Sequence, residues 1–87
     1  MGALWENYLI SERIKKNLNN NLNKDLYFWR TYDGQEIDIV EVSGNDMAAF
    51  ELKWGERQVK APVAFAQTYE QATFQVINRT NYLEFVM

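Results

Sequence analysis

The chain has 87 residues, which is enough for one small domain with a modest core. Hydrophobic residues make up 47% of it, so a folded domain is expected and a disordered chain is not. It contains no His and no Cys, which excludes Ser-His-Asp and Cys-His catalysis, disulfides and zinc sites built on imidazole or thiolate. Enzymatic chemistry would have to use carboxylates, Lys, Tyr, Ser or Thr, and carboxylates favour hard cations such as Mg²⁺ and Mn²⁺.

The net charge of −3 is unlike that of most nucleic-acid-binding domains, which are basic. Three cations, Lys53, Arg57 and Lys60, nevertheless fall within eight positions. They could form a positive rim that contacts a phosphate backbone, although a solvated turn explains them as well. The sequence has neither a glycine-rich phosphate loop nor an apolar run long enough to span a membrane. No signal peptide is seen either, so we expect a cytoplasmic protein without membrane contact.

The hydrophobic pattern predicts the following elements in chain order. Apolar residues four apart predict a helix over 2–18, which the Asn-rich segment 17–25 ends. Strands are predicted over 26–31, 36–42 and 47–54, the first two separated by the turn Asp33-Gly34. A helix over 61–71, with Pro62 in its first turn, precedes a strand over 73–77 and a possible further short strand over 82–86. The order α-β-β-β-α-β predicts one α/β domain over 1–87 with a mixed sheet.

Charged residues interrupt the two middle strands. Glu36 and Asp38 lie in one strand, and Glu51 and Lys53 lie in the next. Charges inside such apolar runs are costly unless they are paired or bind something. Because strand side chains alternate, Glu51 and Lys53 share one face of the sheet. These residue types together are the layout of a metal site made by two carboxylates with a cation beside it.

The turn between these strands sets which charges meet. Ser43-Gly44-Asn45-Asp46 has the composition of a hairpin turn, and a turn centred on Gly44-Asn45 pairs Val42 with Met47. That register places Asp38 directly opposite Glu51, and Glu36 opposite Lys53. Like charges facing each other destabilise a sheet, so a bound cation would explain why both are present. The alternative is a solvated sheet edge.

Glu6 is a third acid with an unusual position. In the first helix it neighbours Ala3, Leu9 and Ile10, so it lies on or beside the apolar face. Such a side chain either reaches out to solvent or points at something in the interior of the fold. An acid near a helix N-terminus is also favoured by the helix dipole, which is the simpler explanation.

The element order and these charges resemble the PD-(D/E)XK nuclease superfamily, the restriction-endonuclease-like fold. Its pattern is a Glu in the first helix, an Asp on the second strand and an acid-x-Lys on the third, and Glu6, Asp38, Glu51 and Lys53 stand at matching places. Four motifs look still more like the domain of unknown function that follows the ATPase module of many prokaryotic AAA+-type ATPases: Gly2-Ala3-Leu4-Trp5-Glu6-Asn7, Tyr27-Phe28-Trp29-Arg30-Thr31, Gly34-Gln35-Glu36-Ile37-Asp38 and Phe50-Glu51-Leu52-Lys53-Trp54-Gly55. The likeness covers nearly the whole chain, so we expect residues 1–87 to be part of a longer ATPase-containing protein.

The resemblance implies a Mg²⁺- or Mn²⁺-dependent nuclease-like domain. Asp38 and Glu51 would hold the ion, Glu6 would add a direct or water-mediated ligand, and Lys53 would act on the attacking water or the phosphate. Two features depart from the family pattern: Ile37 replaces its Pro, and the Gln-x-x-x-Tyr of some nuclease branches is missing. Two functions remain open, a phosphodiesterase acting on nucleic acid and a non-catalytic module of the same fold that binds nucleic acid or a protein partner for the ATPase.

Overall fold

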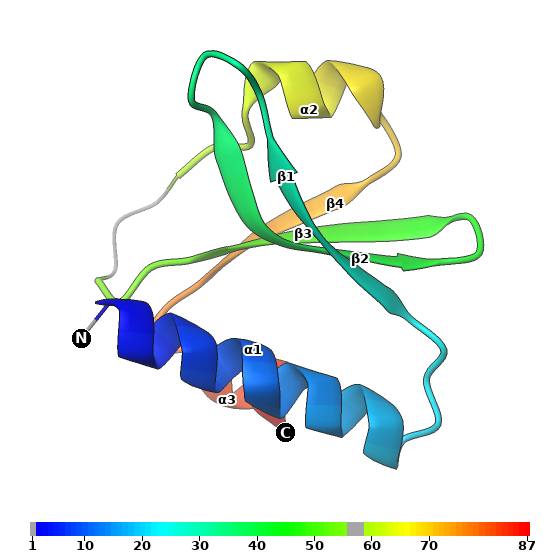
Figure 1. The fold of residues 1–87 in the computed structure, drawn as a ribbon, viewed down its shortest axis with the longest axis vertical. Coiled ribbons are helices and arrows are strands. Elements are labelled where there is room, and N and C mark those ends of the chain that lie inside the picture. The colour runs from blue at the N-terminus through cyan, green and yellow to red at the C-terminus, as the bar shows by residue number, and fades with distance from the viewer. Residues whose placement is uncertain (1, 56–58) are drawn as a thin grey trace.

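A four-stranded mixed sheet lies between helices in the computed structural model, which describes residues 2–55 and 59–87 (Figure 1). The elements are α1 (Gly2–Asn19), β1 (Asp25–Arg30), β2 (Glu36–Ser43), β3 (Asp46–Leu52), α2 (Val63–Thr68), β4 (Thr73–Ile77) and α3 (Tyr82–Val86). The strand order is β1-β2-β3-β4; β1, β2 and β3 pair antiparallel, and β4 joins β3 in parallel through the crossover helix α2. The predicted α/β class with a mixed sheet is confirmed.

Each face of the sheet has its own core. On the face covered by α1 and α3, the buried side chains are Trp5, Leu9, Ile39, Phe50, Leu52, Ile77 and Phe85. On the face covered by α2, a smaller cluster contains Ile37, Val40, Ala49 and Phe65. The long helix α1 therefore covers one face over most of its length, whereas the six residues of α2 cover only part of the other.

The predicted hairpin between β2 and β3 is confirmed. Val42 pairs with Met47, and Gly44 adopts φ +60° at the first turn position, where a two-residue hairpin of type II′ needs glycine. The last regular pair is Ile39 with Phe50. On its other side β2 pairs irregularly with β1, because Tyr27 faces Val40 but Trp29 faces Ile37. One extra β2 residue is therefore accommodated around Asp38, in the manner of a β-bulge.

The predicted strand over 82–86 is wrong: this segment forms the helix α3. Its β-branched and aromatic residues suggested a strand, but the preceding turn sets a different course. Asn78 Oδ1 accepts hydrogen bonds from the backbone N–H of Thr80 and of Asn81, while Asn81 Oδ1 accepts one from the N–H of Asn78. This side-chain-bonded turn ends β4 and starts a helical turn that buries Phe85 against the core.

The predicted helix over 61–71 is shorter in the structure, where it spans Val63–Thr68. Pro62 precedes the first turn as the N-cap residue instead of lying inside it. The segment 17–25 behaves as predicted at its centre, where Asn21 takes a left-handed conformation with φ +55° just after α1. No helix within the described residues is long and apolar enough to cross a membrane.

Candidate metal site and family

Asp38 and Glu51 come together where β2 and β3 diverge. Continuing the register one step past Ile39 and Phe50 sets these two residues opposite each other, as predicted. Both side chains are half-buried, and their carboxyl groups share a hydrogen bond. Phe50 and Leu52 belong to the core under α1, so the alternation of β3 directs Glu51, between them, to the face of the sheet that carries α2.

The backbone fixes Asp38 in place. Its Oδ2 accepts a hydrogen bond from the backbone N–H of Leu52 at 2.8 Å, one residue beyond Glu51. The side chain thus takes the place of the next backbone partner at the point where the regular ladder stops. A carboxylate held in this way on a rigid strand is pre-positioned for a ligand, as the residues of a binding site need to be.

The pair has an unusual ionisation. Burial, the hydrogen bond with Asp38 and the charge of Asp38 raise the pKa of Glu51 to about 8, while the nearby Lys53 opposes the shift. Near neutral pH the carboxyl group of Glu51 therefore keeps its proton, since two like charges this close cannot both ionise cheaply. A divalent cation would also compensate the negative charge of these carboxyl groups, and it carries two positive charges where the proton carries one.

Glu6 lies in the first turns of α1, and the charges of this site act on its pKa. Burial raises its pKa, and among the charges Asp38 raises it further whereas Lys53 lowers it. The charges of Asp38 and Glu36 raise the pKa of both Glu6 and Glu51, and in each case Asp38 has the larger effect. No set of three or more acidic side chains in the described ranges 2–55 and 59–87 has the geometry of a metal site, so Glu6 is a neighbour of the pair by charge.

Among the described residues, Lys53 at the end of β3 is the cation whose charge acts on the pair. Lys53 follows the last residue of that strand and is exposed, and its charge acts on both Glu51 and Glu6. Its backbone N–H donates to the carbonyl of Ile77, which anchors the residue to β4. Lys60 is exposed as well. Arg57, the third cation of the predicted rim, lies outside the described residues.

The model of the family Domain of unknown function (DUF4143) matches residues 1–83. The chain belongs to this family. Comparisons with curated proteins and with solved structures gave no match. In this DUF4143 domain, the roles of Asp38, Glu51, Lys53 and Glu6 therefore follow from their chemistry alone.

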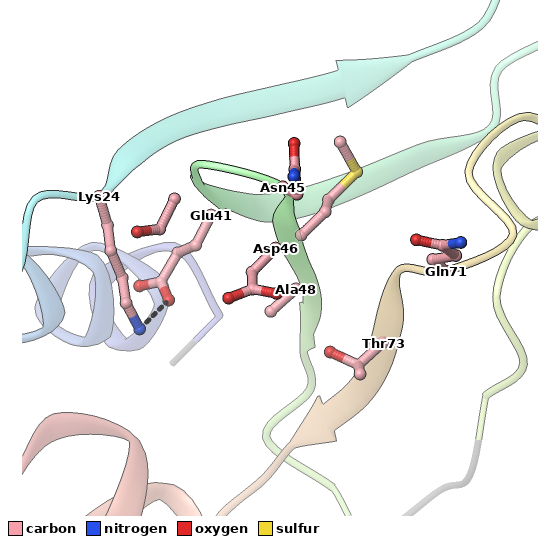
Figure 2. Close-up of a pocket in the computed structure, with 9 residues that line it drawn as sticks. Lys24, Glu41, Asn45, Asp46, Ala48, Gln71 and Thr73 are labelled. Atoms are coloured by element: carbon pink, nitrogen blue, oxygen red, sulfur yellow. Dashed lines mark ion pairs between the residues drawn. The ribbon is translucent and has the colours of Figure 1, made fainter.

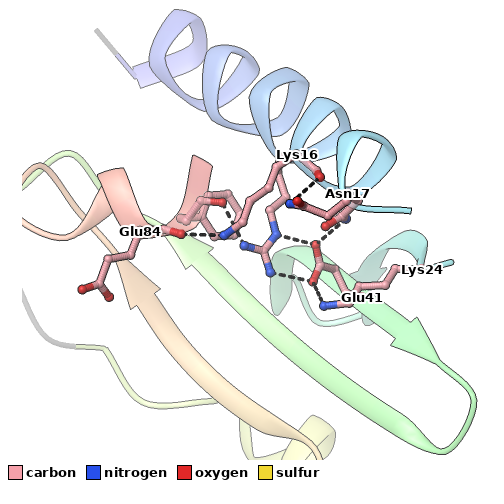
Figure 3. Close-up of polar contacts among 8 residues, drawn as sticks. Lys16, Asn17, Lys24, Glu41 and Glu84 are labelled. Carbon is pink, nitrogen blue, oxygen red and sulfur yellow. Dashed lines mark hydrogen bonds and ion pairs between the residues drawn. The ribbon is translucent and has the colours of Figure 1, made fainter. Parts of the chain in front are cut away.

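The DUF4143 domain buries a second acid that the sequence analysis missed. Glu41, also on β2, is 3% exposed and forms a salt bridge with Arg13 of α1, whose Nε and Nη2 donate to its two carboxylate oxygens at 2.6 and 2.8 Å (Figure 3). Asn17 adds a third hydrogen bond at 3.1 Å, and Lys24 lies 3.7 Å away. Burial alone would raise the pKa of Glu41, but the hydrogen bonds from Arg13 and Asn17 and the nearby positive charges lower it overall.

All three nitrogens of the Arg13 guanidinium donate hydrogen bonds. It also donates to the carbonyl of Phe85 at 2.8 Å and lies over the rings of Phe50 and Phe85, 5.2 and 4.6 Å from their centroids. This network ties α1 to β2 and α3 and is structural. The only sequence signal for it was one acid in a β-branched run and one base on a helix, with no spacing rule to join residues 28 apart.

A hollow of about 250 Å³ lies beside this network at the hairpin end of the sheet, and Figure 2 shows the side chains around it. Most of its lining side chains are polar, and they include Lys24, Asp46 and Thr73, with Glu41 at its inner side. The ion pair drawn there joins Lys24 to Glu41, so the buried acid at this hollow already has its cations. The hollow thus differs from the Asp38–Glu51 site, where each acid faces another acid and no ion pair with a cation is seen among the described residues.

Proposed function

We propose that this DUF4143 domain is a Mg²⁺- or Mn²⁺-dependent phosphodiesterase that acts on nucleic acid and works attached to an AAA+-type ATPase. The observation that carries the proposal is the half-buried Asp38–Glu51 pair, in which two carboxyl groups face each other and the backbone N–H of Leu52 holds one of them in place. If both groups were ionised, two carboxylate charges ~5 Å apart would repel by ~3 kcal/mol at an effective dielectric near 20. A small domain keeps such a pair only if something that binds there offsets the cost.

The donor set suits a hard divalent cation. Asp38 and Glu51 supply carboxylate oxygens from two neighbouring strands, and the backbone N–H of Leu52 orients the first of them. Glu6 would complete the shell directly or through water. When bound, the ion would polarise a phosphodiester and lower the pKa of a water molecule. The order of Glu6, Asp38, Glu51 and Lys53 along the elements also supports descent from PD-(D/E)XK nucleases.

Lys53 has a separate role in this proposal. Its ammonium group is exposed at the end of β3 and would offset the negative charge that develops on the phosphate, or position the water that attacks it. The residue is proposed to act on the substrate and not on the ion. Metal binding and cleavage should therefore respond differently when its charge is removed.

The alternative is a non-catalytic module of the same fold that binds nucleic acid or a protein partner for the ATPase. Two observations favour it: the acidic net charge of −3, and the lack of any three-acid metal cluster in the part of the chain that the structure describes. The four residues at matching places favour the enzyme, because a module without catalysis has no need of all of them.

The deciding experiment measures metal binding and cleavage in parallel. Wild type, Asp38→Asn and Lys53→Met are melted with and without Mn²⁺ and incubated with labelled single- and double-stranded DNA and RNA. We expect Asp38→Asn to lose both properties. Lys53→Met should keep the metal-induced stabilisation and lose cleavage by ~10²–10³-fold, the usual effect of removing one electrostatic contact in a transition state. Metal binding without cleavage by wild type would favour the non-catalytic module.

A further inference from the structure

The face of the sheet that α2 covers only partly carries an open aromatic pocket of about 300 Å³. Its walls come from Tyr27, Phe28 and Trp29 of β1 and from Phe65 and Tyr69 of α2 and its C-cap, over Val40. The volume is at the low end for ligand pockets, which suits a single ring system better than a large ligand. The three outer rings are well exposed, at 57% for Tyr27, 53% for Phe28 and 39% for Tyr69.

The inner rings of this pocket brace one another. Trp29 meets Phe65 edge-on, with 5.4 Å between their centroids, and Phe65 meets Tyr69 at 5.1 Å. Phe65 itself is buried in the core. The pocket therefore has a rigid aromatic base with exposed tyrosines at its rim, which is a surface on which a planar ring can stack without much ordering of side chains.

The pocket adjoins the Asp38–Glu51 pair. Val40, in its floor, is two residues after Asp38 on β2, a separation of ~7 Å along a strand. Phe28, in its wall, lies opposite the irregular stretch of β2 that contains Asp38, because its neighbours pair with residues 40 and 37. By the alternation of β3, Glu51 lies on the same face of the sheet as the pocket. A single nucleotide can span this distance from its phosphate to its base.

A cation lies next to Phe28, one of the residues that line the pocket. The guanidinium of Arg30 lies over the Phe28 ring, 4.8 Å from its centroid, and its side chain is largely exposed. It pairs with Glu36 only at 3.8 Å, an exposed contact that is weak in water. The other exposed cation, Lys53, lies at the end of β3, two residues after Glu51. An aromatic pocket, a candidate metal pair and two exposed cations together match an anionic chain that carries planar rings better than they match an apolar peptide.

We propose that this pocket receives one unpaired base of a single-stranded nucleic acid whose neighbouring phosphate lies at the Asp38–Glu51 pair. The inference rests on the proposed function for the position of the phosphate, and it names single strands as the substrate class. A paired base in a duplex cannot enter, since its ring is stacked and its edge is occupied. Base stacking on aromatic side chains tolerates every base, so little sequence preference is expected.

The test is a binding measurement made with Lys53→Met, which is expected to hold metal and not to cut. Fluorescence anisotropy follows an eight-nucleotide single-stranded DNA, a duplex of the same sequence, and a series in which one abasic site moves along the single strand. We expect the single strand to bind more tightly than the duplex. One abasic position should weaken binding by ~5–150-fold, the effect of losing one stacked base, and Tyr27→Leu should remove that position dependence.

Tyr8→Leu is the matched control, because Tyr8 is an exposed tyrosine on α1, away from the pocket. Tyr69→Leu is a second pocket variant, and melting curves verify that each variant folds. Equal binding of duplex and single strand, or abasic effects unchanged in both pocket variants, would overturn the inference. Metal-dependent cleavage of duplexes that Tyr27→Leu does not affect would refute base binding in the pocket but support the phosphodiesterase. Binding that depends on the abasic position, without metal binding or cleavage, would support the pocket but refute the phosphodiesterase.

Discussion

β2 carries two buried or half-buried acids three residues apart, and they are treated in opposite ways. Glu41 receives three hydrogen bonds from Arg13 and Asn17 and a second cation from Lys24. Asp38 receives one backbone hydrogen bond and faces Glu51. Inside the protein, positive charges and hydrogen bonds compensate the buried charge of Glu41. The negative charges of Asp38 and Glu51 can be compensated only by a proton or an external cation. We therefore assign a functional role to Asp38 and a structural role to Glu41.

The largest effect should come from breaking the satisfied network. Arg13→Met keeps an unbranched side chain but leaves Glu41 buried without its main partner, which should cost ~3–5 kcal/mol of unfolding free energy. For a domain of this size we expect the melting temperature to fall by more than ~10 °C. Thermal unfolding of Arg13→Met and of the double variant Arg13→Met/Glu41→Leu measures it. The double variant should be the more stable of the two; equal losses would argue against an uncompensated charge.

The Asp38–Glu51 pair should destabilise the fold as the pH rises, whereas Glu41 should do so as the pH falls. Because its pKa is about 8 in the folded chain and the ordinary value is 4.5, Glu51 holds a proton that the unfolded chain releases. Its contribution is fully present below about pH 4.5 and is lost as the pH rises towards 8. After allowance for solvent screening, we expect ~1–2 kcal/mol of unfolding free energy to be lost between pH 6 and pH 9.

Glu51→Gln should flatten this slope, since the amide cannot ionise, and denaturant melts at several pH values would show it. Glu41 gives the contrasting case. Its lowered pKa stabilises the fold above the ordinary value of 4.5, and that contribution is lost as the pH falls through the lower folded pKa. A wild type whose alkaline slope equals that of Glu51→Gln would show that the pKa of Glu51 is not raised in the folded chain.

The smallest effect is expected at the edge of the satisfied network. Lys24 lies 3.7 Å from Glu41, and its side chain is 29% exposed, so it adds little to what Arg13 provides. Lys24→Met should cost less than ~1 kcal/mol, as partly exposed ion pairs usually do. A loss as large as that of Arg13→Met would mean that the charges around Glu41 act as one indivisible unit. Urea unfolding resolves a difference of this size.

The sequence predicted the pair at the hairpin and could not predict the network. Gly44-Asn45 is a local signal, and alternation then carries the register from Val42 and Met47 to Asp38 and Glu51. The Arg13–Glu41 contact depends on how α1 docks across the sheet, which no local spacing encodes. The helix α3 was missed for a related reason: Asn78 and Asn81 form a turn whose hydrogen bonds override the strand-like composition that follows.

The most direct test of the difference between the two acids is a divalent-metal titration at pH 8, where the proton on Glu51 competes less than it does at neutral pH. We expect Mg²⁺ or Mn²⁺ at ~100 times its dissociation constant to add ~2.7 kcal/mol, a rise of order 10 °C in melting temperature. Asp38→Asn should abolish most of that rise, because the amide oxygen can still accept from Leu52 N–H but carries no charge. Asp46→Asn, at an exposed acid near the hairpin turn, should keep it. A folded wild type with no rise, or an equal rise in Asp38→Asn, would contradict the metal site.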